Sequence, residues 1–279
     1  MKVFFGIDVT KNKKNESYDG EIFIGKRLPE ALAKSMDSWE ASSDALEEKG
    51  KLPLVLRIIQ VAAFAVAAIC FLAIVRSDVS IFQGYRNAPW AFYACGIGAV
   101  VWAVLTLLGW LRGRQASNSE EAAVSSHRLQ NLKKSCYDAL EVPDSAPFVD
   151  ILVMRYKNKK GKPVPAPKTP TVFLNPELRI FVQDNKLCLA DLYQRFDIPL
   201  EEIDGIHRMD ARGTAPLWNK TLSFSDEPYK SYKITSNQYG IIFKPYYALF
   251  VRRDGVTYAL FFPPYELPTF QSLTGCGIV

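Results

Sequence analysis

The chain has 279 residues, of which 48% are hydrophobic and 23% charged, and its formal net charge at pH 7 is +5. These averages are ordinary for one or two folded domains, and so small a positive charge, without an aromatic and basic platform, argues against a nucleic-acid partner. The five cysteines are scattered and odd in number, which excludes a disulfide framework and suits a reducing compartment.

Residues 1–51 are predicted to form a small cytoplasmic unit, a β-hairpin followed by a helix. Two β-rich stretches, Val3–Val9 and Glu21–Gly25, flank a polar loop, and a helix then begins near Pro29. Apolar or small residues recur in that helix at four- and three-residue spacing: Leu32, Met36, Trp39, Ser43 and Leu46. Because a lone two-stranded hairpin is marginal in water, we expect residues 1–50 to dock on the C-terminal domain.

Residues 52–112 are predicted to form a transmembrane helical hairpin, with helices at about 54–75 and 89–111. Each apolar run reaches the roughly 20 residues needed to cross a hydrocarbon core about 30 Å thick. The chain shows no secretory signal before the first run, so we expect that run to be retained as an anchor in the lipid bilayer.

Basic residues near the helix ends predict the orientation. Lys49, Lys51 and Arg57 precede or open the first helix and Arg112 and Arg114 follow the second, whereas the connection has only Arg76 and Arg86. Lysine and arginine are enriched on the cytoplasmic side, so we expect a multi-pass protein of the cell membrane with both termini in the cytoplasm.

Small residues form a row in each membrane helix. The second helix has Ala91, Cys95, Ala99 and Ala103 at four-residue spacing, and the first has Ala63 and Ala67. Small side chains let helix backbones approach closely in lipid, so these residues are predicted to pack the hairpin on itself. A homodimer built on the same faces is the competing use.

Residues 113–143 are predicted to contain a juxtamembrane helix, from about Ser119 to Leu140. Ser125, Leu129, Leu132, Cys136 and Ala139 again step by four and three. Two alternatives stay open: this helix pairs with the helix near residues 30–46 as a stalk, or each helix covers the β-domain.

Residues 144–279 are predicted to form a cytoplasmic β-rich domain, closed by a short helix over Glu266–Leu273. Many short strands with explicit turns, such as Arg253-Asp254-Gly255, are typical of an antiparallel barrel or sandwich. The predicted strands are Val149–Tyr156, Thr171–Leu174, Leu178–Gln183, Lys186–Leu192, Arg195–Ile198, Tyr232–Thr235, Tyr239–Phe243, Tyr247–Arg252 and Val256–Phe262. The fold class is therefore an α+β membrane protein.

The run Arg195-Phe196-Asp197-Ile198-Pro199-Leu200-Glu201-Glu202-Ile203, with Leu187-Cys188-Leu189 before it and Phe261-Phe262-Pro263-Pro264-Tyr265 at the end, resembles bacterial pleckstrin-homology-like domains attached to membrane helices. The resemblance covers about residues 170–275 and implies a binding or scaffolding module without catalytic residues. This chain departs from the pattern in a long insertion at Asp210–Pro228 and a short final helix broken by Pro268.

No residue set predicts an enzyme, a cofactor or a metal site. The two histidines, His127 and His207, have no cysteine or carboxylate nearby at metal-ligand spacing. The acidic patch of Glu201, Glu202, Asp204 and Asp210 reads as a solvated turn.

Two basic loops are the main functional prediction. Lys11, Lys13 and Lys14 lie in the first, and Lys157, Lys159, Lys160 and Lys162 in the second, which runs on to Lys168. Near a cytoplasmic leaflet, anionic lipids attract such lysines, although solubilising turns are the alternative reading. We therefore expect a membrane-anchored, non-enzymatic binding or scaffold protein, whose β-domain engages a protein or a lipid headgroup. The competing function is an accessory subunit of a membrane transporter or envelope-enzyme complex, with the hairpin as its interface.

Overall fold

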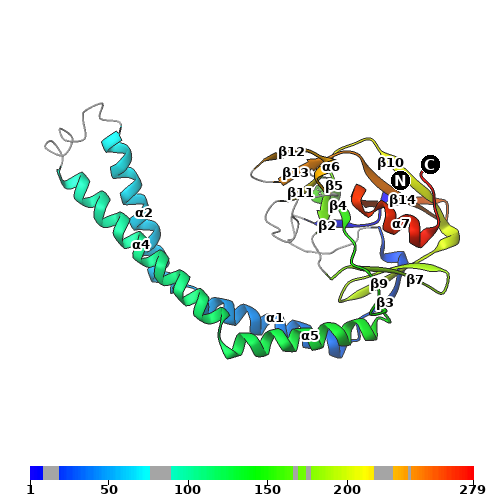
Figure 1. The fold of residues 1–279 in the computed structure, drawn as a ribbon, viewed down its shortest axis with the longest axis horizontal. Helices are drawn as coiled ribbons and strands as arrows, with labels where there is room; N and C mark the ends of the chain where they lie inside the picture. Colours follow the sequence, from blue (N-terminus) through cyan, green and yellow to red (C-terminus); the bar gives the residue numbers. More distant parts are fainter. Residues whose placement is uncertain (9–18, 76–88, 166–168, 174–176, 217–228, 238–239) are drawn as a thin grey trace. The chain divides into compact units, whose positions relative to one another are not determined.

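The computed structural model describes residues 1–8, 19–75, 89–165, 169–173, 177–216, 229–237 and 240–279 (Figure 1). The chain divides into two compact units: Met1–Ala33 with Lys133–Val279, here called the β-domain, and Lys34–Leu132, here called the helical unit. Helices α1 (Glu30–Gly50) and α5 (Glu120–Ala139) each pass from one unit into the other. The protein is thus an α+β chain in which a helical insertion interrupts the β-domain.

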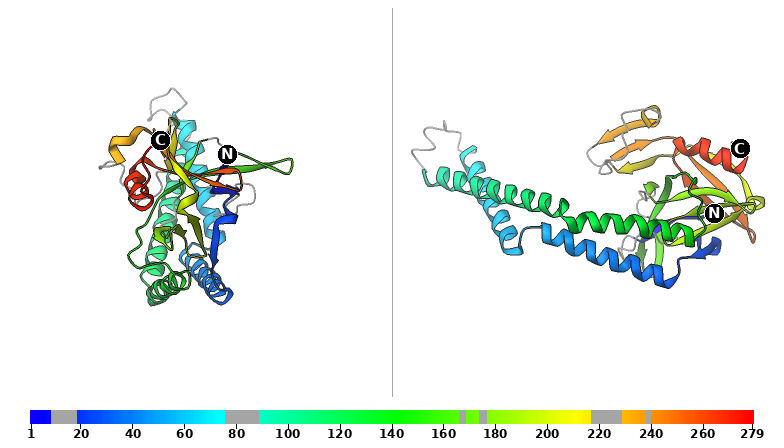
Figure 2. Two further views of the ribbon diagram at one scale, coloured as in Figure 1. Left: turned by 90° about the vertical axis from the view of Figure 1, so that its right-hand side faces the viewer. Right: turned by 60° about the horizontal axis from the view of Figure 1, so that its bottom comes forward.

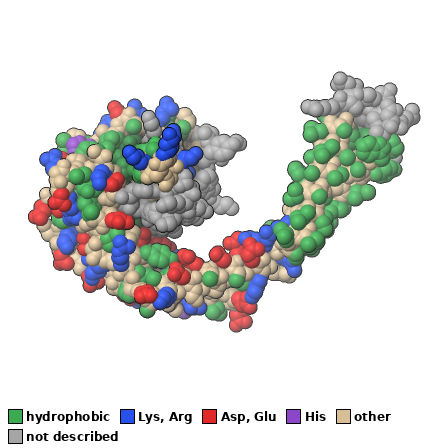
Figure 3. Space-filling view, turned by 180° about the vertical axis from the view of Figure 1, so that it is seen from behind, with side chains coloured by type: hydrophobic (Ala, Val, Ile, Leu, Met, Phe, Trp, Pro, Cys, Tyr) green, Lys and Arg blue, Asp and Glu red, His purple; other side chains and the backbone are tan. Residues whose placement is uncertain are grey.

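Two helices of the helical unit, α2 (Leu54–Val75) and α4 (Pro89–Ser117), are long and apolar enough to cross a membrane. Their best windows have mean hydropathy values of 2.8 and 2.1, and only 6% and 17% of those windows are buried. A core helix of a soluble protein would be mostly buried, whereas the visible face of this pair is covered by apolar side chains (Figure 3).

Helices α1 and α5 run side by side in the helical unit (Figures 1 and 2). The Trp39 indole N–H donates to the backbone oxygen and the hydroxyl of Ser125, each at 3.0 Å, and Lys49 pairs with Glu121 at 3.0 Å. The last turns of α5 instead belong to the β-domain, where Tyr137 is buried and its hydroxyl donates to the Glu177 backbone oxygen at 2.8 Å. Helix α5 therefore pairs with α1 over its first part and packs on the β-domain in its last turns, so the structure combines the two predicted arrangements.

The described strands of the β-domain form two sheets rather than a closed barrel. The larger sheet has 11 strands and is mostly antiparallel, in the order β10-β14-β15-β4-β6-β11-β13-β12, with β1, β2 and β5 beside this path. The smaller sheet has the order β3-β9-β8-β7. The strands are β1 (Lys2–Val3), β2 (Gly6–Asp8), β3 (Ile24–Arg27), β4 (Ile151–Lys159), β5 (Lys162–Pro165), β6 (Thr171–Phe173), β7 (Arg179–Gln183), β8 (Lys186–Ala190), β9 (Gln194–Pro199), β10 (Ile203–Met209), β11 (Gly213–Pro216), β12 (Lys233–Asn237), β13 (Gly240–Phe243), β14 (Tyr246–Arg253) and β15 (Val256–Phe262).

Short helices complete the β-domain. The final helix α7 (Leu267–Thr274) agrees with the predicted helix over Glu266–Leu273, and α6 (Tyr229–Tyr232) precedes β12. Single 3-10 turns are formed by Glu21–Phe23, Leu200–Glu202 and Pro264–Glu266.

The predicted N-terminal hairpin does not form among the described residues. Strand β1 pairs in parallel with β15 and β2 in parallel with β4, whereas β3 joins the other sheet beside β9. Strands β4 and β15 are paired with each other only at Leu152 and Phe261, so the N-terminal segment fills the opening where they diverge. The expected docking of the N-terminal residues is thus achieved by strand pairing, for residues up to Ala33.

The two sheets share one hydrophobic core. Side chains from both pack together in it: Phe4, Phe23, Ile180, Leu187, Leu189, Phe196, Ile198, Leu249, Val251, Leu260 and Phe262, with Phe270 of α7. Strand β15 is buried on both faces, since Leu260 and Phe262 point into this core and Ala259 and Phe261 into a second cluster.

A buried ion pair connects the end of α5 to the smaller sheet. The Arg195 guanidinium donates to both carboxylate oxygens of Asp197, at 2.7 and 3.0 Å, and to the Leu140 backbone oxygen at 3.0 Å. Gly25 lies against this pair, because an added Cβ there would sit 2.2 Å from an Asp197 carboxylate oxygen. A larger residue at that position would require Asp197 to move within the ion pair.

Candidate functional site

The second basic segment, predicted as a loop, is a β-hairpin made by the end of β4 and β5. Lys157 pairs with Val164 and Lys159 with Lys162, leaving Lys160 and Gly161 as a two-residue turn. Both turn residues have positive φ, 54° and 79°, and the Gly161 N–H donates to the Asn158 side-chain oxygen at 3.0 Å. Turns of this kind match the twist of the flanking strands, so the turn fixes the register of the hairpin.

That register gathers the lysines on one face. Because side chains alternate along a strand, Lys157, Lys159 and Lys162 share a face with Val164, and Lys160 lies at the tip. All are exposed, and none of these lysines is paired with a carboxylate among the described residues. Lys159 and Lys162 are directly opposite, which is unfavourable for like charges. An anionic surface would relieve that repulsion.

The hairpin is suited to side-chain contact rather than strand addition. Proline has no N–H, and Pro163 and Pro165 stand at alternate positions of the edge strand β5, so one edge lacks its donors. Prolines and lysines on an edge protect it against pairing with other strands. The remaining predicted lysines, Lys11, Lys13 and Lys14, lie outside the described residues.

The helix-packing residues of the prediction divide into two groups. Ala91 is buried, and the Cys95 thiol donates to the Ala67 backbone oxygen at 3.6 Å, so these residues lie where α2 and α4 meet. Ala99 and Ala103, in contrast, are exposed.

Gly98 takes the place of Ala99 in the helix contact. An added Cβ there would lie 2.8 Å from the Ala63 backbone oxygen and 3.2 Å from the Ala67 Cβ. Further along the hairpin, the Gln60 amide donates to the Thr106 hydroxyl at 2.9 Å. The contact thus combines close backbone approach with an interhelical hydrogen bond, two devices that hold helices together in lipid.

Most of the predicted acidic patch is neutralised by neighbouring strands. Glu202 pairs with Arg253 at 2.8 Å, Asp204 with Arg252 at 2.9 Å, and Asp210 with Lys244 at 3.8 Å. The arrangement is that of surface ion pairs.

Two half-buried carboxylates, Asp150 and Glu266, carry no recognisable signal in the sequence and lie just before β4 and just before α7. The Asp150 N–H donates to Glu266 Oε1 at 3.0 Å, the Tyr265 hydroxyl to Asp150 Oδ2 at 2.7 Å and the Thr269 hydroxyl to Glu266 Oε2 at 3.2 Å. Burial raises the pKa of Asp150, and burial with the nearby Asp150 charge raises the pKa of Glu266 to about 7. Every described partner is part of the fold, so the cluster connects β4 to α7.

Neither histidine belongs to a group of possible metal ligands among the described residues. His127 is exposed on α5 beside Asn131, and His207 stacks on Phe250 with ring centroids 4.1 Å apart. Within the described ranges, no group of three His, Cys, Asp or Glu residues could hold a metal ion.

Comparison of the chain with protein-family models, with curated proteins and with solved structures finds no match. The resemblance of residues 170–275 to pleckstrin-homology-like domains therefore stays a prediction.

Proposed function

We propose that the protein is a membrane-anchored, non-enzymatic binding module. Helices α2 and α4 cross the cell membrane, both termini are cytoplasmic, and the β-domain presents the cationic hairpin to anionic phosphate groups at the membrane surface. The proposal has two parts, the membrane topology of the chain and the contact of the cationic hairpin with the membrane surface.

The topology is supported by one observation above all: residues from both ends of the chain build the same domain. Phe4 and Phe23 share a core with Leu249 and Phe262, while both candidate spans lie in the intervening chain. A domain that contains both chain ends requires an even number of crossings between them. The lysine and arginine bias supports a cytoplasmic location for that domain.

The contact with the membrane surface is supported by the hairpin, whose strand lysines lie on one face. A lysine near an anionic leaflet gains about 1 kcal/mol, so the three lysines on one face would contribute about 3 kcal/mol together. Exposed Val164 on the same face adds an apolar contact. Since such attraction is screened within about 10 Å at 0.1 M salt, the contact should weaken as salt is added.

Cysteine labelling tests the topology. Ser80→Cys, in the connection between α2 and α4, should react with a membrane-impermeant maleimide outside intact cells, above the wild-type background. Ser126→Cys, exposed on α5, should react only after the cells are opened. Labelling of Ser126→Cys from outside would overturn the proposed orientation, and extraction of the chain by alkaline carbonate would overturn the membrane crossing.

Hydrogen exchange of the full-length protein in nanodiscs tests the surface. Backbone amides of residues 157–165 should be better protected in discs rich in phosphatidylglycerol than in phosphatidylcholine discs, and the difference should vanish in high salt. A triple variant, Lys157→Gln, Lys159→Gln and Lys162→Gln, should lose the difference. The control with the same charge change, Lys134→Gln, Lys230→Gln and Lys233→Gln, should keep it, and equal protection in both lipids would refute the contact.

An accessory-subunit role is the second candidate, and the exposed side of α4 favours it. Ala99 and Ala103 offer a surface of small side chains that the α2 contact does not use. Crosslinking in native membranes through Ala99→Cys would then give one defined heterologous product, whereas no product from this position would count against the role.

A further inference from the structure

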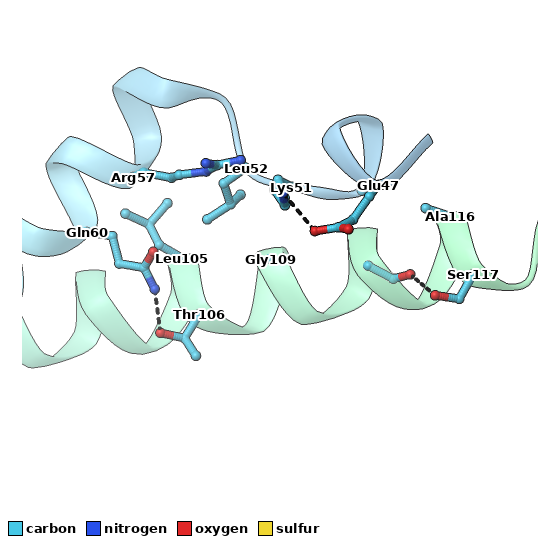
Figure 4. Close-up of a pocket in the computed structure, with 12 residues that line it drawn as sticks. Glu47, Lys51, Leu52, Arg57, Gln60, Leu105, Thr106, Gly109, Ala116 and Ser117 are labelled. Carbon is cyan, nitrogen blue, oxygen red and sulfur yellow. Dashed lines mark hydrogen bonds and ion pairs between the residues drawn. The ribbon is translucent and has the colours of Figure 1, made fainter. Parts of the chain in front are cut away.

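The helical conformation is interrupted between α1 and α2, and α4 passes this interruption as one continuous helix (Figure 4). Lys51, Leu52 and Pro53 link the two helices, and an added Cβ on Gly50, the last residue of α1, would lie 3.0 Å from the Ala116 Cβ of α4. Leu52 is buried against Gly109, whose added Cβ would be 3.3 Å from the leucine Cδ1. The break is thus fixed against a face of small residues on α4.

A cavity of about 450 Å³ remains at this break. Such a volume is within the range of roughly 300–1,000 Å³ that small-molecule sites span. One wall is apolar, made by Leu52, Leu105 and Gly109, and the rim carries Glu47, Lys51 and Arg57 (Figure 4). The cavity is therefore amphipathic, with a charged mouth and an apolar side.

The mouth has charges of both signs, and Glu48, which does not itself line the cavity, pairs with two of the lining residues. Lys51 Nζ lies 2.8 Å from carboxylate oxygens of both Glu47 and Glu48, and an Arg57 Nη atom is 3.5 Å from Glu48. The lysine holds the pKa of Glu48 below its usual range through a hydrogen bond. These side chains are 39–69% exposed, so their pairs are weak and exchangeable with the charges of a ligand.

We propose that this cavity binds a phospholipid with a primary-amine headgroup, of the phosphatidylethanolamine class. Its phosphate contacts Lys51 and Arg57, its ammonium group contacts Glu47 and Glu48, and an acyl chain starts along Leu52 and Leu105. The inference rests on the proposed membrane crossing, because α2 begins at Leu54, which then places the cavity at headgroup level.

The charges of the mouth discriminate among lipids. Phosphatidylglycerol offers no cation to the two carboxylates, and the quaternary ammonium of phosphatidylcholine has no N–H to donate to them. A primary ammonium both carries the charge and donates hydrogen bonds, which are stronger when both groups are ionised.

Two glycines of α4 provide a matched pair of variants. Gly113 lines the cavity and has no atom within 4 Å of an added Cβ, so the side chain of Gly113→Leu starts in open space and takes up room in the cavity. Gly96 has equally open surroundings on the same helix but does not line the cavity, so Gly96→Leu is the control. Both substitutions remove a helical glycine, and their common effect on the helix cancels.

The experiment measures the thermal midpoint of the purified full-length chain in detergent as each lipid is added, with bound lipid counted by native mass spectrometry. Phosphatidylethanolamine should raise the midpoint of the wild type and of Gly96→Leu in a saturable manner, and Gly113→Leu should lose that rise. The double variant Glu47→Gln and Glu48→Gln should bind phosphatidylethanolamine and phosphatidylcholine alike.

An equal rise with all three lipids in the wild type, or an unchanged rise in Gly113→Leu, would overturn the site. Either result would leave the membrane crossing untouched if the variant still resists carbonate extraction. Release of the wild-type chain by carbonate would instead remove the proposed function, so the two failures are distinguishable.

Discussion

The contact between α2 and α4 predicts a specific cost for a single methyl group at Gly98. In Gly98→Ala the new Cβ would lie 2.8 Å from the Ala63 backbone oxygen, closer than real Cβ atoms approach. That oxygen belongs to a helix backbone and cannot rotate away, so the two helices must separate by a few tenths of an ångström. Overpacking of this kind costs about 1–3 kcal/mol.

Replacing glycine with alanine also favours the helix itself, by up to about 1 kcal/mol in water. Gly96→Ala carries the same gain without the clash, because nothing lies within 4 Å of an added Cβ at Gly96. The difference in unfolding free energy between the two variants therefore isolates the steric term. We expect Gly98→Ala to be less stable than Gly96→Ala by about 1–3 kcal/mol.

Reversible unfolding of the full-length protein in mixed micelles, followed by circular dichroism, measures this difference. Ala99→Leu, next to Gly98 on the exposed side of α4, should change the stability by less than about 0.5 kcal/mol, as surface substitutions usually do. If Gly98→Ala and Gly96→Ala were equally stable, the close approach of the helices at Gly98 would be refuted.

Three further predictions concern the rest of the fold. Gly25→Ala should displace Asp197 from its buried ion pair and lower the unfolding free energy by about 3 kcal/mol in a urea titration; a loss below 1 kcal/mol would contradict the tight fit. Glu266, with a pKa raised from 4.5 to about 7, favours the folded state while it is protonated, so stability should fall by about 3 kcal/mol as pH rises from 4.5 to 7. Glu266→Gln should lack that fall, and a parallel decline in both proteins would exclude this carboxyl as its source. Trp39→Phe should lose the hydrogen bonds to Ser125 and about 1 kcal/mol, seen as faster hydrogen exchange in α1 and α5, whereas unchanged exchange would mean that these bonds do not hold the pair.

The long helices were predictable because their signals are local. Apolar runs and three-four spacing placed α1, α2 and α5 close to their observed ends and α4 at its observed start, although α4 continues to Ser117 instead of ending near residue 111. The row of small residues on α4 was misplaced for a geometric reason. Each four-residue step advances about 40° around a helix, so Ala103 lies about 120° from Ala91. Alternating steps of three and four residues stay on one face, and they lead from Ala91 to the buried residues Gly98 and Leu105.

Strand pairing was less predictable, because pairing partners are not marked in the sequence. The nearest β-rich neighbour of Val3–Val9 is Glu21–Gly25, yet burial of Phe4 and Phe5 is achieved only between β4 and β15. Strand β5 was read as loop because prolines disfavour strands, although an edge strand tolerates them. The lysines of the candidate site can be read from the sequence, but their common face depends on the register with β4.

The pairing of β1 with β15 also determines when β1 can join the sheet during biosynthesis. Lys2 and Val3 pair with Tyr258 and Ala259, which lie far along the chain and are therefore synthesised much later. At ~5–20 residues per second, translation of the intervening chain takes on the order of ten seconds to one minute. During that interval Phe4 and Phe5 have no core to enter, and both apolar helices emerge before it exists. Strand β1 is therefore synthesised before both apolar helices but can pair with β15 only after α2 and α4 have left the ribosome.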